Sequence, residues 1–199
     1  MSKHNYFILY KPYGVLSQFT REHPDHRVLG DLYGFPRDVY AVGRLDKDSE
    51  GLLLLTNDKT LNQRLLDPQQ GHQRTYWAQV EGDIDENALQ QLRQGVDIRI
   101  KKKDYRTHPA KARRLVSSPD LPERDPPIRY RKNVPDSWLE LQLTEGKNRQ
   151  VRRMCAAVGF PVLRLVRVAI GQLTLGGLKA GEVKAIPSEP LMRQLNLNY

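Results

Sequence analysis

The chain has 199 residues, 39% of them hydrophobic, which is enough to bury a core without covalent staples. Its single cysteine, Cys155, cannot form an internal disulfide, and neither an export signal nor an apolar run close to the roughly 20 residues of a membrane-spanning helix is present, so we expect a cytoplasmic protein. The 32 Lys and Arg against 23 Asp and Glu give a formal charge of +9, which suits a partner as densely anionic as nucleic acid.

The first part of the chain predicts strands that flank one polar loop. Residues 6–10 are aromatic and aliphatic and predict a strand, residues 40–42 predict a second short strand, and residues 52–56 predict a buried one. Residues 43–51 are polar and bounded by glycines. The segment rich in carboxylates is therefore expected in a loop between strands.

Helices and strands alternate in the rest of the chain. The predicted elements are a helix capped by Asn57 or Asp58 and ended by Pro68, a strand at 75–80, a helix from the capping-box pair Asp83 and Glu86 to Gln94, a strand at 138–143, a helix at 148–158, a strand at 162–170 and a last helix at 189–195. In the helix at 148–158 the apolar residues at helical spacing are Val151, Met154, Cys155 and Val158. This buried stripe turns the arginines of the same helix toward other faces, where they can meet a ligand.

Positive charge is concentrated in two segments. Between residues 99 and 114 eight Lys and Arg accompany a single acid, Asp104, and residues 147–153 hold four bases and no acid. Residues 117–135 contain five prolines and predict a long irregular excursion. A binding role and an adaptable surface insertion are both open for this excursion.

Three blocks stand in order along the chain: residues 43–58 (GRLDKDSEGLLLLTND), residues 74–82 (RTYWAQVEG) and residues 145–154 (EGKNRQVRRM). They resemble the catalytic signature, the tyrosine motif and the basic helix motif of RsuA-type pseudouridine synthases. The likeness continues through residues 159–171, so it covers nearly the whole chain.

Within that family, residues 125–129 (DPPIR) and 135–138 (PDSW) are most similar to the RluE branch, which acts on large-subunit 23S ribosomal RNA. The resemblance implies ribosomal RNA as the partner. We also expect no membrane association and a monomer. Many relatives begin with a small RNA-binding S4 module, whereas the first strand here starts by Tyr6. We therefore expect no S4 domain, with RNA affinity supplied by the basic segment at 99–114 and the proline-rich excursion.

The resemblance also implies the architecture. We expect an α+β fold with a central mixed, mainly antiparallel sheet flanked by helices and loops. An N-terminal α/β lobe at residues 1–66 would include the catalytic loop, and residues 67–199 would form the main catalytic lobe with the basic insertion. A continuous single domain is the open alternative.

Pseudouridine formation breaks the bond from the ribose to uracil N1 and rejoins the ribose to C5, so nothing enters or leaves and neither a cofactor nor a metal is implied. The reaction needs one ionised carboxylate beside the ribose, either as a nucleophile at C1′ or as a base at C2′. The family match assigns that carboxylate to Asp46. It makes Arg152 the cation that keeps the carboxylate charged.

A uridine in folded RNA must be flipped out before its sugar is accessible, and an aromatic surface in the pocket offsets the unstacking. Tyr76 matches the ring that stacks on the uracil, and Leu165 matches an apolar part of the base pocket. Arg44, beside the carboxylate, is expected to displace the base or contact a phosphate. The other RNA contacts are assigned to Lys101, Lys102, Lys103, Lys147, Arg149, Arg153 and Arg167.

Two other functions stay open from the residues alone. A metal-dependent nuclease would use Asp46, Asp48 and Glu50 to bind divalent ions beside a basic groove. A non-catalytic ribosomal RNA-binding or assembly factor would keep the fold without the chemistry. The five histidines show no metal-ligand spacing.

Overall fold

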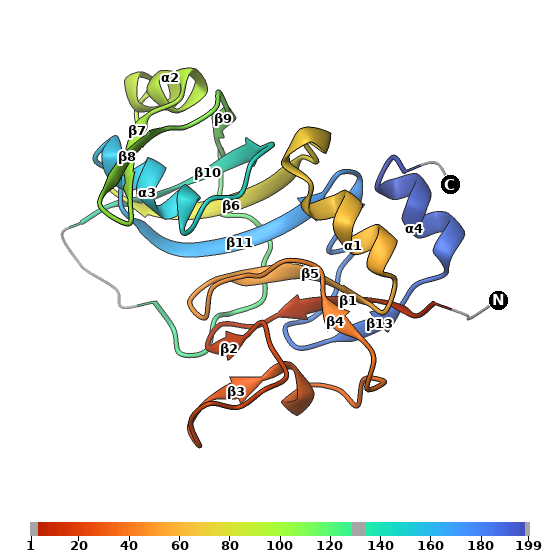
Figure 1. The fold of residues 1–199 in the computed structure, drawn as a ribbon. Helices are drawn as coiled ribbons and strands as arrows, with labels where there is room; N and C mark the ends of the chain where they lie inside the picture. The colour runs from red at the N-terminus through yellow and green to blue at the C-terminus, as the bar shows by residue number, and fades with distance from the viewer. Residues whose placement is uncertain (1–3, 129–133, 198–199) are drawn as a thin grey trace. The chain divides into compact units, whose positions relative to one another are not determined.

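The computed structural model describes residues 4–128 and 134–197, which group into two compact units (Figure 1). The first unit comprises the residues up to His72 and those from Arg167 onward, and the second comprises Gln73–Val166. The boundary expected at residues 66 and 67 placed the C-terminal segment in the second lobe, whereas the structure groups it with the N-terminal unit. Arg129, part of the RluE-like segment, lies outside the described residues.

The first unit is built on a sheet. Its strands are β1 (Tyr6–Lys11), β2 (Val15–Leu16), β3 (Arg27–Val28), β4 (Tyr40–Ala41), β5 (Glu50–Thr56), the end of β11 (Val162–Ile170), β12 (Leu173–Thr174) and β13 (Val183–Ala185). The hydrogen-bonded order is β13-β1-β5-β11, with an antiparallel register between β1 and β5 that puts Phe7 opposite Leu55, while β2 and β3 form a separate parallel pair. All of β1 and β5 is buried, which accounts for their unbroken apolar runs.

Two helices complete the first unit, α1 (Lys59–Leu66) and α4 (Ser188–Gln194). Asp58 is the cap of α1, because its carboxylate accepts a hydrogen bond from the Leu61 amide at 3.0 Å. This contact decides between the two caps that the sequence left open. The core of the unit contains Phe7, Leu9, Val15, Leu29, Val39, Leu53 and Leu55.

The second unit contains sheet strands, a hairpin and helices. Its elements are β6 (Arg74–Glu81), α2 (Glu86–Gln94), β7 (Asp97–Ile100), β8 (Lys103–Arg106), β9 (Lys111–Arg114), β10 (Asp136–Leu143), α3 (Gln150–Ala157) and the start of β11. The sheet order is β11-β6-β10-β9, and β7 and β8 form a separate antiparallel hairpin. Among the described residues, the strand pairs with a defined register are antiparallel apart from the separate pair β2 and β3, so the expected α+β class is confirmed.

One core joins α2 and α3 to the same face of this sheet. Ala78 of β6 and Leu139 of β10, which are register partners, pack with buried residues of both helices. The predicted stripe of α3 is confirmed: Val151, Met154 and Cys155 are buried and Val158 packs against them.

The capping box predicted for α2 is wrong in register. The side chain of Asp85, not Asp83, accepts a hydrogen bond from the Ala88 amide at 2.8 Å, so α2 begins at Glu86. Glu86 is then the first helical residue and pairs with Arg93 near the end of the helix. Both aspartates precede the helix, and the hydrogen bond alone identifies the cap.

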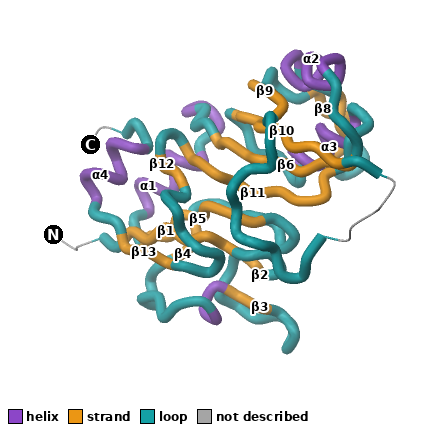
Figure 2. The backbone as a smooth tube through the Cα atoms, turned by 180° about the vertical axis from the view of Figure 1, so that it is seen from behind, coloured by secondary structure: helices purple, strands orange, loops and turns teal. Residues whose placement is uncertain are grey.

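The described part of the proline-rich excursion, up to Ile128, contains neither helix nor strand and runs as a long loop (Figure 2). Its contact to the sheet is made by Arg164 of β11, whose Nη2 donates to the Pro122 carbonyl at 2.8 Å. The sequence therefore predicted the irregular character of this segment correctly.

Candidate functional site

Asp46 lies half-buried in the loop between β4 and β5, as the sequence predicted. The Ser49 amide donates to the Asp46 carbonyl at 3.0 Å and closes a turn. The buried Ser17 hydroxyl donates to the Leu45 carbonyl at 2.8 Å and accepts from the Leu45 amide at 3.0 Å. The carboxylate is therefore presented from a backbone that is fixed on both sides.

A buried lysine accompanies this loop. Lys11, the last residue of β1, has no exposed surface, and its Nζ donates to the Val15 carbonyl at 2.7 Å. Burial lowers the pKa of Lys11 to about 7, against the opposing effect of the carboxylates of Glu50, Asp48 and Asp46. The acidic loop thus has a buried partner whose charge changes near neutral pH.

The start of β5 lies close to β11. Gly51 has a φ of 108°, and a Cβ there would come within 2.3 Å of the Arg167 carbonyl oxygen, so no other residue fits. Arg167 is only 4% exposed, and its Nε donates to the Leu52 carbonyl at 2.8 Å. Arg167, expected on the RNA surface, is thus held inside the first unit, whereas Arg44 is exposed.

Tyr76 and Leu165 belong to one apolar cluster of the second unit. Tyr76 is partly buried on β6, opposite Leu141 of β10. Leu165, 6% exposed on β11, belongs to the core cluster against which Tyr76 packs. The two residues predicted for the base pocket therefore share one apolar cluster.

The arginines at the start of α3 have different surroundings. Arg149 precedes the helix with a φ of 51°, and Arg152 is partly buried with its Nη1 donating to the Val162 carbonyl at 3.2 Å. Arg153 donates from Nε to the Asn148 carbonyl at 3.1 Å and from Nη1 to the carbonyl of Arg99 on β7. The guanidinium of Arg153, expected to contact phosphate, thus fastens the hairpin to α3.

Glu145 is a buried connecting residue that sequence reasoning did not single out. Its carboxylate accepts hydrogen bonds from the Tyr105 hydroxyl, from the His108 amide at 2.9 Å and from Gln150 Nε2 at 2.5 Å. Burial alone would raise the pKa of Glu145, but these hydrogen bonds lower it, and they raise the pKa of Tyr105 to about 12. One buried carboxylate therefore connects β8, the turn before β9 and α3. Its place at the head of the basic helix motif was the signal available in the sequence.

The tip of the β7–β8 hairpin displays lysines. Lys101 and Lys102 have φ values of 47° and 67°, and both are exposed together with Lys103. Within the described part of the chain these three lysines form no ion pair, whereas Arg106, Arg113 and Arg114 pair with Asp97, Glu140 and Asp83. Lys147, exposed before α3, lies with Nζ 4.9 Å from the centre of the Tyr105 ring. The hairpin and the start of α3 thus form one basic surface, comprising Arg99, Lys101, Lys102, Lys103, Lys147 and Arg149.

The site residues divide between the units. Arg44, Asp46 and Arg167 belong to the first, and the second contains Tyr76, Lys101, Lys102, Lys103, Lys147, Arg149, Arg152, Arg153 and Leu165. Among residues 4–128 and 134–197 no group of three or more His, Cys, Asp or Glu is placed to hold a metal ion. Over the same described ranges no helix is long and apolar enough to cross a membrane.

Comparison with known proteins identifies the family to which the chain belongs. A family model described as RNA pseudouridylate synthase matches residues 5–157. A ribosomal large subunit pseudouridine synthase E from Xanthomonas campestris pv. campestris is 57% identical over 176 residues, which are 88% of this chain and 91% of that protein. The chain belongs to the RNA pseudouridine synthase family. A protein of the same name from Vibrio parahaemolyticus is 49% identical over 179 residues, covering 90% of this chain and 72% of that protein.

The fold agrees with this family. A crystal structure of a pseudouridylate synthase superimposes with a TM-score of 0.78 at 26% identity, covering 98% of this chain and 75% of that one. The predicted class of enzyme, an isomerase that makes pseudouridine, is confirmed, as is the resemblance to the RluE branch.

Proposed function

We propose that this pseudouridine synthase modifies a uridine of large-subunit ribosomal RNA and that Asp46 is its catalytic carboxylate. The observation that carries the proposal is the half-buried Asp46 in a loop with a fixed backbone, inside the signature that the family model covers. The substrate follows from relatives named ribosomal large subunit pseudouridine synthase E, one of them 57% identical.

The reaction requires one ionised carboxylate oxygen beside the ribose. Asp46 attacks C1′ or removes the proton from C2′, and in either case the uracil detaches at N1, turns and rejoins through C5. C5 then loses its proton and N1 gains one, and the bond to Asp46 or the proton taken from C2′ is given back, so the product is an isomer of the substrate. Arg152 keeps the carboxylate charged, and its guanidinium is oriented by the hydrogen bond to the Val162 carbonyl.

The target base is extruded from the RNA before reaction. The ring of Tyr76 stacks on the uracil, and Leu165, in the same apolar cluster, contributes an apolar wall. Arg44, exposed beside the acidic loop, occupies the place that the base leaves or contacts a phosphate. These roles are supported by the motif positions of the three residues.

Phosphates are bound by the basic surface of the second unit. Lys101, Lys102 and Lys103 supply charges that no described acid neutralises, and Glu145 holds their hairpin on α3. Because such contacts release counterions, affinity falls as salt rises. The surface binds any RNA backbone and leaves the choice of uridine to other contacts.

The proposal is tested by mapping pseudouridine in RNA from cells that lack the gene and carry a plasmid copy. The unmodified chain should restore pseudouridine at one site in large-subunit RNA, whereas Asp46→Asn should not. Asp48→Asn is the control, because Asp48 is a neighbouring carboxylate of the same loop, and it should restore the site. Loss of a transfer RNA site with ribosomal RNA unchanged would refute the substrate. Loss of the purified enzyme's activity in EDTA, with the RNA still folded, would point to metal chemistry instead.

A further inference from the structure

One end of the second unit's sheet holds a cavity of about 200 Å³. Its lining residues come from the position just before β6, from β9 with the turn before it, and from the end of β10 with the residue after it, namely Gln73, Pro109, Ala110, Lys111, Gln142 and Thr144. Gln142 is the register partner of Thr75, so strand alternation puts it on the face of the sheet opposite to Tyr76. The cavity therefore cannot take the base that stacks on Tyr76.

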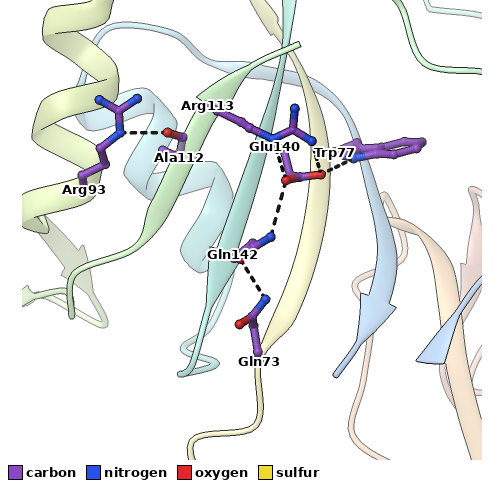
Figure 3. Close-up of polar contacts among 7 residues, drawn as sticks. All are labelled: Gln73, Trp77, Arg93, Ala112, Arg113, Glu140 and Gln142. Carbon is purple, nitrogen blue, oxygen red and sulfur yellow. Dashed lines mark hydrogen bonds and ion pairs between the residues drawn. The ribbon is translucent and has the colours of Figure 1, made fainter. Parts of the chain in front are cut away.

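A line of hydrogen bonds runs along this face and ends in the cavity (Figure 3). Arg113 donates from Nε and Nη2 to Glu140 at 2.9 and 3.1 Å, and Trp77 Nε1 donates to the same carboxylate at 3.0 Å. Gln142 Nε2 donates to Glu140 Oε1 at 3.4 Å, and Gln73 Nε2 donates to Gln142 Oε1 at 2.8 Å.

The charge of Glu140 orients both amides. Its side chain is 14% exposed, and although burial alone would raise the pKa of Glu140, the hydrogen bonds from Arg113 and Trp77 lower it. An ionised carboxylate only accepts hydrogen bonds, so Gln142 turns its NH₂ toward Glu140 and its oxygen toward Gln73. Gln73 in turn directs its NH₂ to Gln142, and its oxygen points away (Figure 3).

Gln73 thus presents a donor and an acceptor side by side at the cavity. One N–H of its amide is used on Gln142, and no donor from residues 4–128 or 134–197 bonds to its carbonyl oxygen. Such an amide can form two hydrogen bonds with the edge of a base. Lys111 of β9 is exposed at the cavity and forms no ion pair with a described residue, while Pro109 and Ala110 supply apolar surface.

We infer that this cavity binds a second, unstacked base of the substrate RNA, near the target uridine in the strand. The Gln73 amide bonds the edge of the base, and Lys111 contacts an adjacent phosphate. The inference rests on the proposed function, because it requires that RNA is the substrate. It goes beyond that function, because recognition of a nearby base by Gln73 would help to select which uridine is modified.

The size and position of the cavity suit this ligand. A volume of about 200 Å³ is below the roughly 300–1,000 Å³ of pockets for drug-sized molecules, and so fits one planar base. Gln73 precedes Tyr76 by three residues, about 10 Å along an extended strand, and lies just before β6, so the RNA reaches the cavity by passing round this end of the sheet. Sequence-selective RNA binding commonly uses such splayed bases.

The test compares Gln73→Met with Gln79→Met on a large-subunit RNA transcript. Gln79 is a matched control, since it lies on the same face of β6 and bonds Asp136 at 3.0 Å instead. We expect Gln73→Met to raise KM about tenfold, because it removes one bidentate contact to the RNA. The kcat of this variant should stay within twofold of that of the unmodified chain. An unchanged KM, or an equal rise in Gln79→Met, would overturn the inference.

Chemical probing of the bound RNA identifies the base. One base other than the target uridine should be protected at its pairing edge by the unmodified chain and by Gln79→Met, and exposed with Gln73→Met. Gln142→Met, which removes the group that orients Gln73, should expose the same base. If the same bases stay protected in every variant, the cavity holds none. Failure of the unmodified chain to modify this RNA would instead refute the proposed function.

Discussion

The Asp46 loop and the β7–β8 hairpin hold their charges in opposite ways. In the loop, backbone hydrogen bonds fix Asp46, and a fully buried Lys11 lies among the acids. In the hairpin, Lys101 and Lys102 extend into solvent, and the buried group, Glu145, lies at the base. The loop holds one charge, that of Asp46, at a fixed position. The hairpin exposes several lysine charges, and only its base is fixed, by Glu145.

This difference teaches which substitutions separate reaction from binding. A chemical step depends on the position of one oxygen atom, so damage to the scaffold of the loop should appear in stability and in kcat. Binding of a polyanion depends on the number of cations, so changes in the hairpin should appear in affinity and its salt dependence.

The largest effect on the loop side is expected from Gly51→Ala. The added Cβ would come within 2.3 Å of the Arg167 carbonyl oxygen at a φ of 108°, so we expect a loss of about 3 kcal/mol or more in the free energy of unfolding. Gly14→Ala is the control, because its φ is 81° with nothing within 4 Å, and should cost only about 1 kcal/mol. Urea unfolding measures both, and equal losses would show that the close approach is not limiting.

The largest effect on the hairpin side is expected from Glu145→Ala. It removes the acceptor for Tyr105, the His108 amide and Gln150 at a buried position, so we expect a loss of about 2–3 kcal/mol in unfolding free energy and faster hydrogen exchange in β7 and β8. Tyr105→Phe removes one of these contacts and should cost about 1 kcal/mol. Unchanged exchange in the hairpin would mean that Glu145 does not attach it.

Removing the lysines should change affinity without changing the rate of the bound complex. In the triple variant Lys101→Gly, Lys102→Gly and Lys103→Ala, glycine suits the φ values of 47° and 67°, so the turn is kept. We expect the slope of log affinity against log salt to become shallower by about 2–3, measured by filter binding at several salt concentrations. Arg106→Gln, paired with Asp97 in the same hairpin, should change the slope by less than about 1.

A smaller effect is expected from the pH dependence of stability. The pKa of Lys11 is about 7 in the folded chain, whereas the unfolded chain has the ordinary value of 10.5. Between pH 7 and pH 10.5 the unfolded chain therefore binds a proton that the folded chain does not. Stability should therefore rise with pH in this window, by about 1 kcal/mol from pH 7.5 to pH 8.5. Lys11→Met should lack this rise in urea unfolding, and parallel curves for the two proteins would contradict the buried neutral lysine.

Local signals in the sequence predicted the elements around the site. The polar run between glycines gave the Asp46 loop, and the helical spacing of Val151, Met154 and Cys155 gave the buried face of α3. Alternation along residues 75–80 placed Tyr76 on a strand, and the same helical spacing placed Arg152 on a helix. These features depend on residues within one turn or one strand.

Features that depend on distant partners could not be predicted. The strands β7 and β8 are short, and Glu145 and Arg153 bond to them from 40 and 54 residues away in the sequence. The hydrogen bond of Arg153 to the Arg99 carbonyl could not be predicted from the motif, because the two residues are far apart in the sequence. The complete burial of Lys11 could not be predicted either, because nothing in the neighbouring residues reveals it.

The most direct measurement is a single-turnover comparison of Asp46→Asn and Asp48→Asn on saturating large-subunit RNA, with binding measured on the same samples. Asp46→Asn should lose at least about a thousandfold in the rate of pseudouridine formation while its Kd stays within threefold, and Asp48→Asn should keep both. If Asp46→Asn retains a rate within tenfold of the unmodified chain, the carboxylate at this position does not perform the reaction.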